Sequence, residues 1–248
     1  VSLPFTGPRV RRHRPARPLG ERGGVPRLRP LTPIAGALCV SVAVLLSGCA
    51  ALAPQPVTTG TSGVHPLGSG FLGGVTTPTP EATIEPERGS WDGVEPPAGY
   101  TVVVVSAGED RATSTLVSGV TRWAQQRGVT LTALTARGDD EVEDQLLRAI
   151  ETSPDLVIGA GPDVVDVFSL TTAQHLHQQF LVVGAELPEP TANVTSVIWA
   201  GASFRGTGIS EDGDVDPSAV TAGRAKEAIT AGVASVLHGL TGIVLHLN

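Results

Sequence analysis

The sequence predicts an α/β fold over residues 99–248, with a doubly wound, mostly parallel, five-stranded open sheet. Beyond residue 99, short β-branched runs alternate with helical stretches of about ten to sixteen residues. Strands that alternate with helices form parallel sheets covered on both faces and joined by right-handed crossovers. The Pro-, Gly- and Thr-rich composition also ends at Tyr100, and this change places the start of the domain.

The predicted elements follow one another closely along the domain. The strands cover residues 100–108, 129–136, 155–159, 180–184 and 194–199, and the helices cover 113–127, 139–150, 162–178 and 218–240. The first strand is a continuous β-branched run, which is typical of a strand buried on both faces. Gly128 ends the first helix, acids open the second, and Pro162 opens the third. Residues 201–216 form a polar loop before the last helix, and we expect the strand order 2-1-3-4-5.

The candidate ligand cleft follows from this topology, because open α/β sheets bind ligands at the carboxyl ends of their strands. The residues that the sequence places at those ends are Ser106, Gly108, Glu109, Asp110, Gly159, Gly161 and Glu186.

Residues 1–48 have the layout of a lipoprotein-type signal peptide. An Arg-rich flank precedes an uncharged apolar run from Leu31 to Leu46. The run ends in Leu-Ser-Gly-Cys49, which resembles the bacterial lipobox. The resemblance implies cleavage before Cys49, a diacylglycerol on its thiol and acylation, often palmitate, of the new amine. The alternative is an uncleaved transmembrane anchor, because the run is just long enough to span a bilayer.

Both interpretations place the rest of the chain on the extracytoplasmic face of the cell membrane, since the positive flank stays inside. The chain begins with Val and contains no Met, so a later translation start, near Val25, is a further hypothesis. The mature chain would keep Cys49 alone and could form no internal disulfide.

Residues 49–98 are rich in Pro, Thr, Gly, Ser and Ala and have no hydrophobic period. Such a segment buries too little apolar surface to offset the entropy of ordering, so it is predicted to be a disordered tether. Phe71 and Trp91 are interpreted as incidental in it.

The charge is unevenly divided along the chain. Residues 1–48 carry a net charge of +7, and residues 49–248 carry −14. An acidic body repels phosphates, so a nucleic-acid partner is not expected.

The sequence contains no recognisable catalytic machinery, and we expect no enzyme activity, cofactor or metal. Gly159 and Gly161 lack the third glycine of a dinucleotide fingerprint, because Val164 stands there. Acids at 139–144 fit a solvated helix start better than a calcium loop. The acids at 211–216 are a better metal candidate, although a solvated loop explains them too. No serine lies in a G-x-S-x-G setting, and an extracellular Rossmann-like enzyme remains an alternative.

The order of elements from Tyr100 to Leu240 resembles the first lobe of the basic membrane protein family, substrate-binding lipoproteins of ABC transporters. The segments that carry the resemblance are 106–108, 154–161, 179–184, 193–197 and 222–223. The resemblance implies a type 1 periplasmic-binding-protein-like lobe, a nucleoside-like small ligand and an ABC permease as partner. The family's Asp-x-Ser-Phe-Asn stretch after the first strand is replaced by residues 109–114.

The chain ends at Asn248, where this family would enter its second lobe. A single lobe offers half a cleft, so we expect a second copy or partner, loss of transport with the fold kept, or a truncated gene. The expected function is non-enzymatic binding of a small ligand. The alternative is a structural or regulatory surface lipoprotein that uses the lobe for protein contacts.

Overall fold

The computed structural model of the protein describes residues 64–202 and 215–248. The chain divides into two units, Val1–Gln55 and Pro56–Asn248, and all described residues belong to the second. The predicted signal peptide and Cys49 therefore lie outside the described residues. In the part of the chain that is described, no helix is long and apolar enough to cross a membrane.

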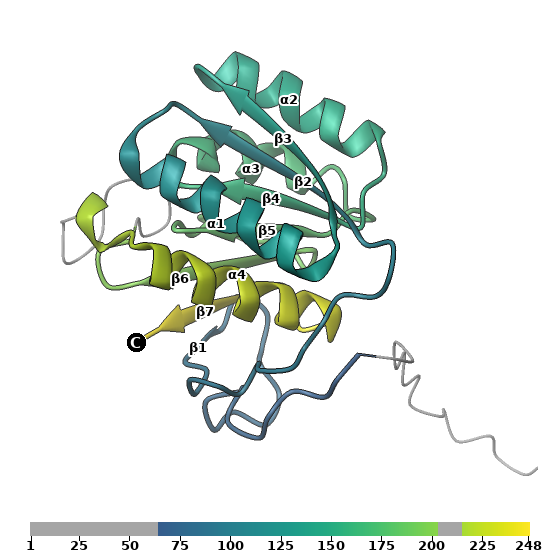
Figure 1. The fold of residues 1–248 in the computed structure, drawn as a ribbon, viewed down its shortest axis with the longest axis vertical. Helices are drawn as coiled ribbons and strands as arrows, with labels where there is room; N and C mark the ends of the chain where they lie inside the picture. The colour runs from purple at the N-terminus through teal and green to yellow at the C-terminus, as the bar shows by residue number, and fades with distance from the viewer. Residues whose placement is uncertain (1–63, 203–214) are drawn as a thin grey trace, which may run out of the picture. The chain divides into compact units, whose positions relative to one another are not determined.

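The fold is built on a parallel seven-stranded sheet of order β1-β7-β6-β5-β4-β2-β3 (Figure 1). Its strands are β1 (Thr83–Ile84), β2 (Thr101–Ala107), β3 (Thr130–Ala136), β4 (Leu156–Ala160), β5 (Phe180–Val183), β6 (Val194–Trp199) and β7 (Ile243–Leu247). Every neighbouring pair is parallel. The predicted α/β class is confirmed, and so is the order 2-1-3-4-5 among the five predicted strands.

The predicted number of strands was wrong, because β7 and β1 extend the sheet beyond β6. β7 follows the last helix as a short apolar run after Gly242, and it pairs with β6 from Thr195 to Trp199. β1 has only two residues, which pair with Val244 and Leu245. A two-residue strand has no periodicity to detect in a sequence, so it exists only because β7 offers a free edge.

Two helices cover each face of the sheet (Figure 1). The helices are α1 (Arg111–Arg127), α2 (Asp139–Glu151), α3 (Val165–Thr172) and α4 (Ala222–Leu237), with short 3-10 turns at Pro162–Val164 and Pro217–Ala219. α1 and α4 pack on one face, and α2 and α3 pack on the other. Each face of the sheet has its own hydrophobic core, and successive side chains of β2 alternate between the two cores. Val102 and Val104 belong to the core on the side of α1, whereas Val103 and Val105 belong to the core on the side of α2.

The third helix is shorter than predicted and ends at Thr172, because a side chain from a distant segment holds its C-terminal turn. The amide nitrogen of Asn193 donates hydrogen bonds to the carbonyl oxygens of Thr172, His175 and Gln178, at 3.2, 3.1 and 3.0 Å. These bonds satisfy carbonyl groups that a continuing helix would have used internally. The last helix likewise begins at Ala222, since Thr221 caps it by accepting a hydrogen bond from the Arg224 amide at 3.2 Å.

The predicted tether is corrected for its described part, because residues 64–98 pack on the lobe. Phe71 and Trp91 are 1% and 7% exposed, and Ile84 of β1 is 2% exposed. The two aromatic rings meet edge to face, with centroids 6.4 Å apart. These side chains join the core that α1 and α4 cover, so the segment orders by burying its few apolar residues against the lobe as well as against one another.

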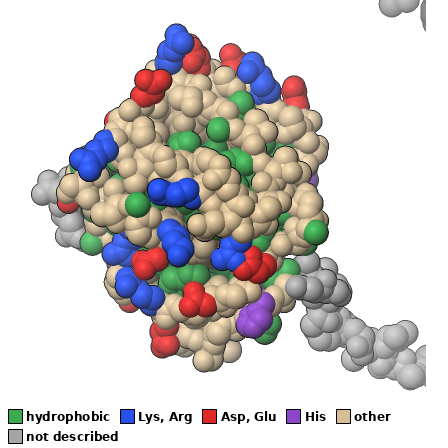
Figure 2. Space-filling view, in the orientation of Figure 1, with side chains coloured by type: hydrophobic (Ala, Val, Ile, Leu, Met, Phe, Trp, Pro, Cys, Tyr) green, Lys and Arg blue, Asp and Glu red, His purple; other side chains and the backbone are tan. Residues whose placement is uncertain are grey.

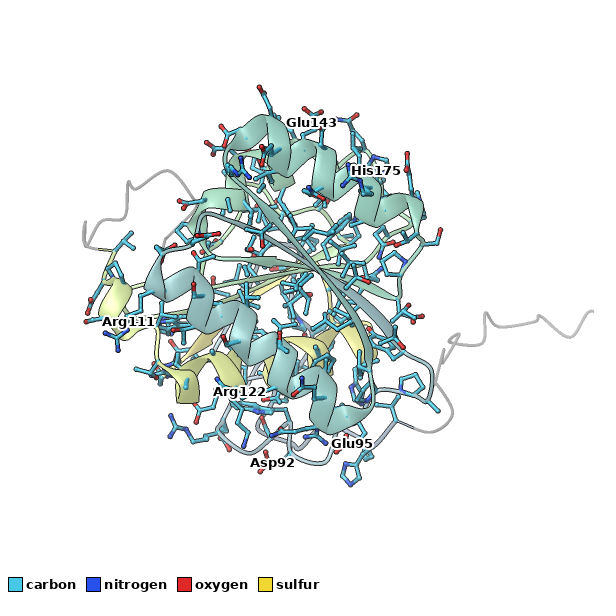
Figure 3. All side chains as sticks on the ribbon, turned by 45° about the horizontal axis from the view of Figure 1, so that its top comes forward. Asp92, Glu95, Arg111, Arg122, Glu143 and His175 are labelled. Atoms are coloured by element: carbon cyan, nitrogen blue, oxygen red, sulfur yellow. The ribbon has the colours of Figure 1, made fainter. Side chains whose placement is uncertain are left out.

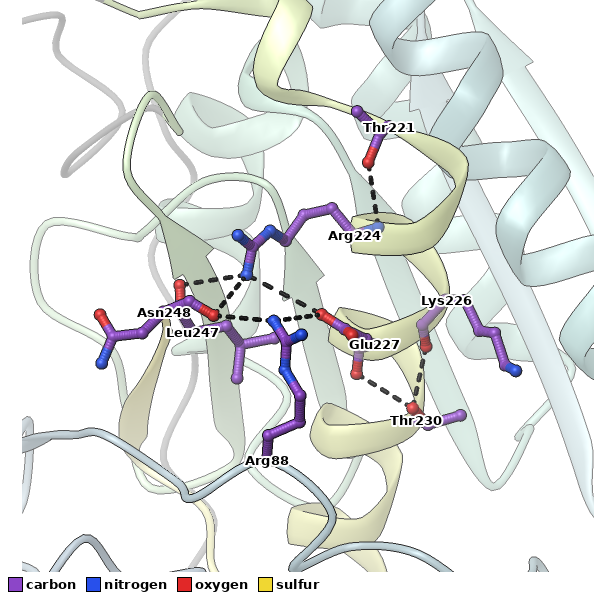
Figure 4. A network of polar contacts seen from close by, with 8 residues as sticks. All are labelled: Arg88, Thr221, Arg224, Lys226, Glu227, Thr230, Leu247 and Asn248. Atoms are coloured by element: carbon purple, nitrogen blue, oxygen red, sulfur yellow. Dashed lines mark hydrogen bonds and ion pairs between the residues drawn. The ribbon is translucent and has the colours of Figure 1, made fainter.

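A polar network ties this segment to α4 and β7 (Figure 4). The Arg88 guanidinium donates to the carbonyl oxygen of Asn248 at 3.1 Å and pairs with Glu227 at 3.4 Å. Arg224 donates to the carbonyl oxygens of Leu247 and Asn248, at 3.3 and 3.1 Å, and lies 3.9 Å from Glu227. Glu227 is therefore shared by two arginines.

Candidate functional site

A cavity of about 770 Å³ lies at the carboxyl ends of β2, β4, β5 and β6. Four stretches of the described chain line it: the start of α1, the turn after β4, Gly184 after β5, and residues 201–202 with 215–222. The lining residues are Asp110, Arg111, Ala112, Thr113, Thr115, Leu116, Gly161, Pro162, Asp163, Gly184, Gly201, Ala202, Val215, Asp216, Pro217, Ser218, Val220, Thr221 and Ala222. A mostly apolar wall with a few polar groups is typical of a small-molecule site.

Two of the seven predicted cleft residues, Asp110 and Gly161, line this cavity. Gly108, with φ +73°, lines a neighbouring hollow that it shares with Asp163. Both glycines adopt left-handed backbone conformations at the ends of strands, where a Cβ would be strained. The strand-end rule thus predicts the correct edge of the sheet.

The other four predicted residues do not line the cavity. Ser106 and Glu186 are each 3% exposed, and Glu109 is exposed to solvent. Gly159 lies under a phenyl ring, because a Cβ there would come 2.8 Å from Cε1 of Phe168. Gly159 therefore makes room for Phe168 in the core, and its assignment to the cleft is corrected.

Sequence reasoning missed the wall formed by Gly201, Asp216, Ser218 and Thr221. These residues lie in or beside the predicted polar loop, in which Asp216 was considered as part of a metal candidate and not as a cleft residue. Part of the signal was present, since Gly201 follows a predicted strand and so belongs at the carboxyl edge of the sheet. Thr221 lay inside the predicted helix 218–240, whereas the structure makes it the N-cap.

Asp110 is the N-cap of α1. One of its carboxylate oxygens accepts hydrogen bonds from the amides of Ala112 and Thr113, at 2.8 and 3.0 Å. Hydrogen bonding by the Thr113 side chain is the main cause that holds the pKa of the Asp110 carboxyl below its ordinary value, and the amides of Thr113 and Ala112 add to it. Asp110 is therefore a fixed negative charge at the mouth of the cavity, and it occupies helix amides that could otherwise bind an anion.

Asp216 is held in a similar way on the opposite wall. Its carboxylate accepts hydrogen bonds from the hydroxyl and amide of Ser218, at 2.6 and 2.8 Å. The bond from the Ser218 hydroxyl lowers the pKa of the Asp216 carboxyl. Among the described residues that line the cavity, Asp110, Asp163 and Asp216 are acidic and Arg111 is the one cation. These residues carry a net negative charge and favour a neutral or cationic ligand over an anionic one.

The described residues hold no group of three or more His, Cys, Asp or Glu placed to bind a metal ion. Four acids of the polar loop were considered as a metal site. Of these, Asp216 is described, whereas Glu211, Asp212 and Asp214 lie outside the described residues. The turn after Gly161 leads into a 3-10 helix of three residues before α3 begins.

No protein-family model matches the chain, and no curated protein matches it. Among solved structures, it is similar to an ABC transporter solute-binding protein from Aeropyrum pernix K1, at 20% identity and a TM-score of 0.37 over 40% of this chain. It is also similar to a glucose-galactose binding protein from Geobacillus stearothermophilus, at 17% identity and 0.34 over 61%. A type II dehydroquinase from Butyrivibrio crossotus matches at 7% identity and 0.33 over 60%.

The chain covers 28% of the Aeropyrum protein, 58% of the Geobacillus protein and 89% of the dehydroquinase. These neighbours include binding proteins and an enzyme, all at low identity and with TM-scores below 0.5. The chain's own residues must therefore decide between functions.

Proposed function

We propose that the protein is a non-enzymatic lipoprotein of the cell membrane, anchored through Cys49, that binds a small ligand on the extracytoplasmic side. The observation that carries the binding function is the cavity of about 770 Å³ at the carboxyl edge of the sheet. Its volume suits one nucleoside-sized molecule. In the basic membrane protein family that the sequence resembles, such a ligand passes to an ABC permease, and we infer the same partner.

The charges of the cavity define the ligand class. The amides at the start of α1 are capped by Asp110, and those at the start of α4 are capped by Thr221. With three carboxylates on the wall, the cavity offers acceptors to hydroxyl and amine groups and repels phosphates. We infer a neutral or cationic ligand rich in such donors, for example an unphosphorylated nucleoside.

The lining residues also support binding without catalysis. Of the residues that the structure describes around the cavity, none is His, Cys, Lys or Glu. The possible bases among these residues are aspartates: the Ser218 hydroxyl donates to the Asp216 carboxylate at 2.6 Å. Hydrogen bonds lower the pKa of both Asp110 and Asp216, which makes each of them a weak base.

Thermal shift of residues 56–248 against nucleosides, sugars and amino acids tests the binding function. The start at residue 56 keeps the packed segment 64–98. A saturating ligand at about 100 times its Kd should raise Tm by about 5–10 °C, and the corresponding nucleoside monophosphate should not.

A pair of variants locates the site. Ala112→Phe fills the cavity at the start of α1 and should abolish the shift. Ala173→Phe adds the same ring at an exposed position after α3, and should preserve it. Equal shifts in both variants would place the ligand elsewhere. No shift with any compound, together with dimer formation on a sizing column, would favour a lobe used for protein contacts.

Metabolic labelling tests the anchor separately. The full chain should incorporate labelled palmitate in a bacterial host and fractionate with membranes. Cys49→Ala should lose the label, whereas Cys39→Ala, inside the predicted signal, should keep it. Label retained in Cys49→Ala would rule out this anchor.

A further inference from the structure

The helices on the two faces of the sheet carry opposite charge. α1 and α4 together hold five cations, namely Arg111, Arg122, Arg127, Arg224 and Lys226, and one acid, Glu227. α2 and α3 hold seven acids and one cation, Arg148. In the orientation of Figure 2, Lys and Arg side chains gather over α1 and α4, and Figure 3 shows Arg111 and Arg122 on α1, away from Glu143 on α2. The chain as a whole is acidic, so this basic face needs an explanation.

Three of the cations on this face have no carboxylate partner within the described residues. Arg127 pairs with Glu95, and Arg224 shares Glu227 with Arg88. Arg111, Arg122 and Lys226 are exposed and belong to no ion pair in residues 64–202 and 215–248. Ion pairs among the described residues therefore neutralise Arg127 and Arg224, and three positive charges on these helices are left available to a partner.

A groove between α1 and α4 lies among these cations. It has a volume of about 270 Å³ and is lined by Gly119, Arg122, Trp123, Gln126, Arg127, Ala222, Gly223, Lys226 and Thr230. Arg122 and Lys226 approach it from different helices, whereas Gly119 and Trp123 are buried beneath. An apolar floor with cations around it suits a group that is anionic at one end and apolar beside it.

We propose that the face of α1 and α4, which we call the basic face, docks on an anionic phospholipid bilayer. Charge complementarity carries the proposal, since each Lys or Arg near an anionic surface raises partitioning about five-fold. The choice of a membrane rests on the proposed anchor: Val64, the first described residue, lies fifteen positions after Cys49. Such a stretch spans at most about 50 Å. An anchored lobe would therefore stay within reach of the bilayer, where weak attraction suffices.

The test uses residues 56–248, the unit that contains all the described residues of both cores. Sedimentation with phosphatidylcholine vesicles is compared with and without about one-third phosphatidylglycerol. The wild-type lobe should bind the anionic vesicles only, and binding should disappear at high salt, because salt screens exposed charges. Arg122→Ala/Lys226→Ala should lower partitioning by about 30-fold.

The matched control is Arg137→Ala/Arg148→Ala, which also removes two exposed cations but leaves the basic face intact. It should bind nearly as wild type, and Tm shows whether each variant is folded. Equal loss in both pairs, or no binding by the folded wild type, would overturn the proposal. Binding to polyglutamate but not to vesicles would overturn it too and indicate an acidic protein. Residues 56–248 lack Cys49, so neither result bears on the lipid anchor. The anchor is tested separately by palmitate labelling.

Discussion

The two faces of the sheet are covered by different means, although one set of strands builds both. On the face of α1 and α4, small residues let backbones approach: a Cβ on Gly232 would lie 2.5 Å from Cδ1 of Leu181. On the face of α2 and α3 the arrangement is reversed: the helix supplies a ring, Phe168, over Gly159 of β4, and this ring meets Phe180 edge to face at 6.1 Å. Residues 64–98 pack against the core on the face of α1 and α4, and none of them joins the core on the face of α2 and α3.

This difference indicates that the two faces of the sheet have different roles. The face of α1 and α4 carries a covering segment, a groove and cations without an ion pair among the described residues, and we have proposed that it docks on a membrane. The other face presents a helix with acids at its start, which keep it solvated. Three sets of variants test how far the two faces form one cooperative unit.

The largest effects are expected from removing one phenyl ring on each face. Phe71→Ala and Phe168→Ala each empty a site that is 1% exposed or less, so each should lower the free energy of unfolding by about 3–5 kcal/mol. Urea unfolding followed by circular dichroism measures both. If Phe71→Ala left the main transition unchanged, residues 64–98 would be a separate, weaker unit and not part of the fold.

A smaller effect is expected from adding one methyl group to α4. Gly232→Ala places a Cβ against Leu181 and Val197, both fully buried, and should cost about 1–3 kcal/mol. Gly223→Ala is the matched control in the same helix, because its Cβ would meet only Thr221 Oγ1, at 4.0 Å. The control should be neutral or stabilise by up to about 1 kcal/mol. Equal melting temperatures for the two variants would show that α4 does not approach the sheet so closely.

The smallest effects concern the caps at the mouth of the cavity. Asp110→Ala and Thr221→Ala should each cost about 1 kcal/mol near neutral pH. Because the folded state lowers the pKa of Asp110, its carboxylate contributes stability above the ordinary pKa of 3.8, and this is lost as pH falls through the folded value. The deficit of Asp110→Ala should therefore shrink in acid, whereas that of Thr221→Ala should not. Thermal melts from neutral to acidic pH measure both, and parallel curves would contradict the cap assigned to Asp110.

The edge of the sheet at which the candidate site lies was predictable from position along the chain. Asp110 and Gly161 follow buried strands, and parallel topology brings the ends of those strands to one edge. Gly159 was misassigned because its role depends on Phe168, which the fold places above it. The wall at Asp216 and Ser218 was missed because a polar stretch before a helix has the same composition whether it lines a cavity or only meets solvent.

The sequence by itself determined the alternation of strands and helices, the order of the five central strands and the edge at which the cavity lies. Local hydrophobic patterns and chain handedness suffice for these features. Only the tertiary structure decided that residues 64–98 fold, that β1 and β7 extend the sheet, and that α3 stops at Thr172. Each depends on a partner far along the chain: a sheet edge for β1, a core for Phe71 and Trp91, and the amide of Asn193 for α3. Composition describes what a segment can bury within itself, and the fold supplies the surface against which it is buried.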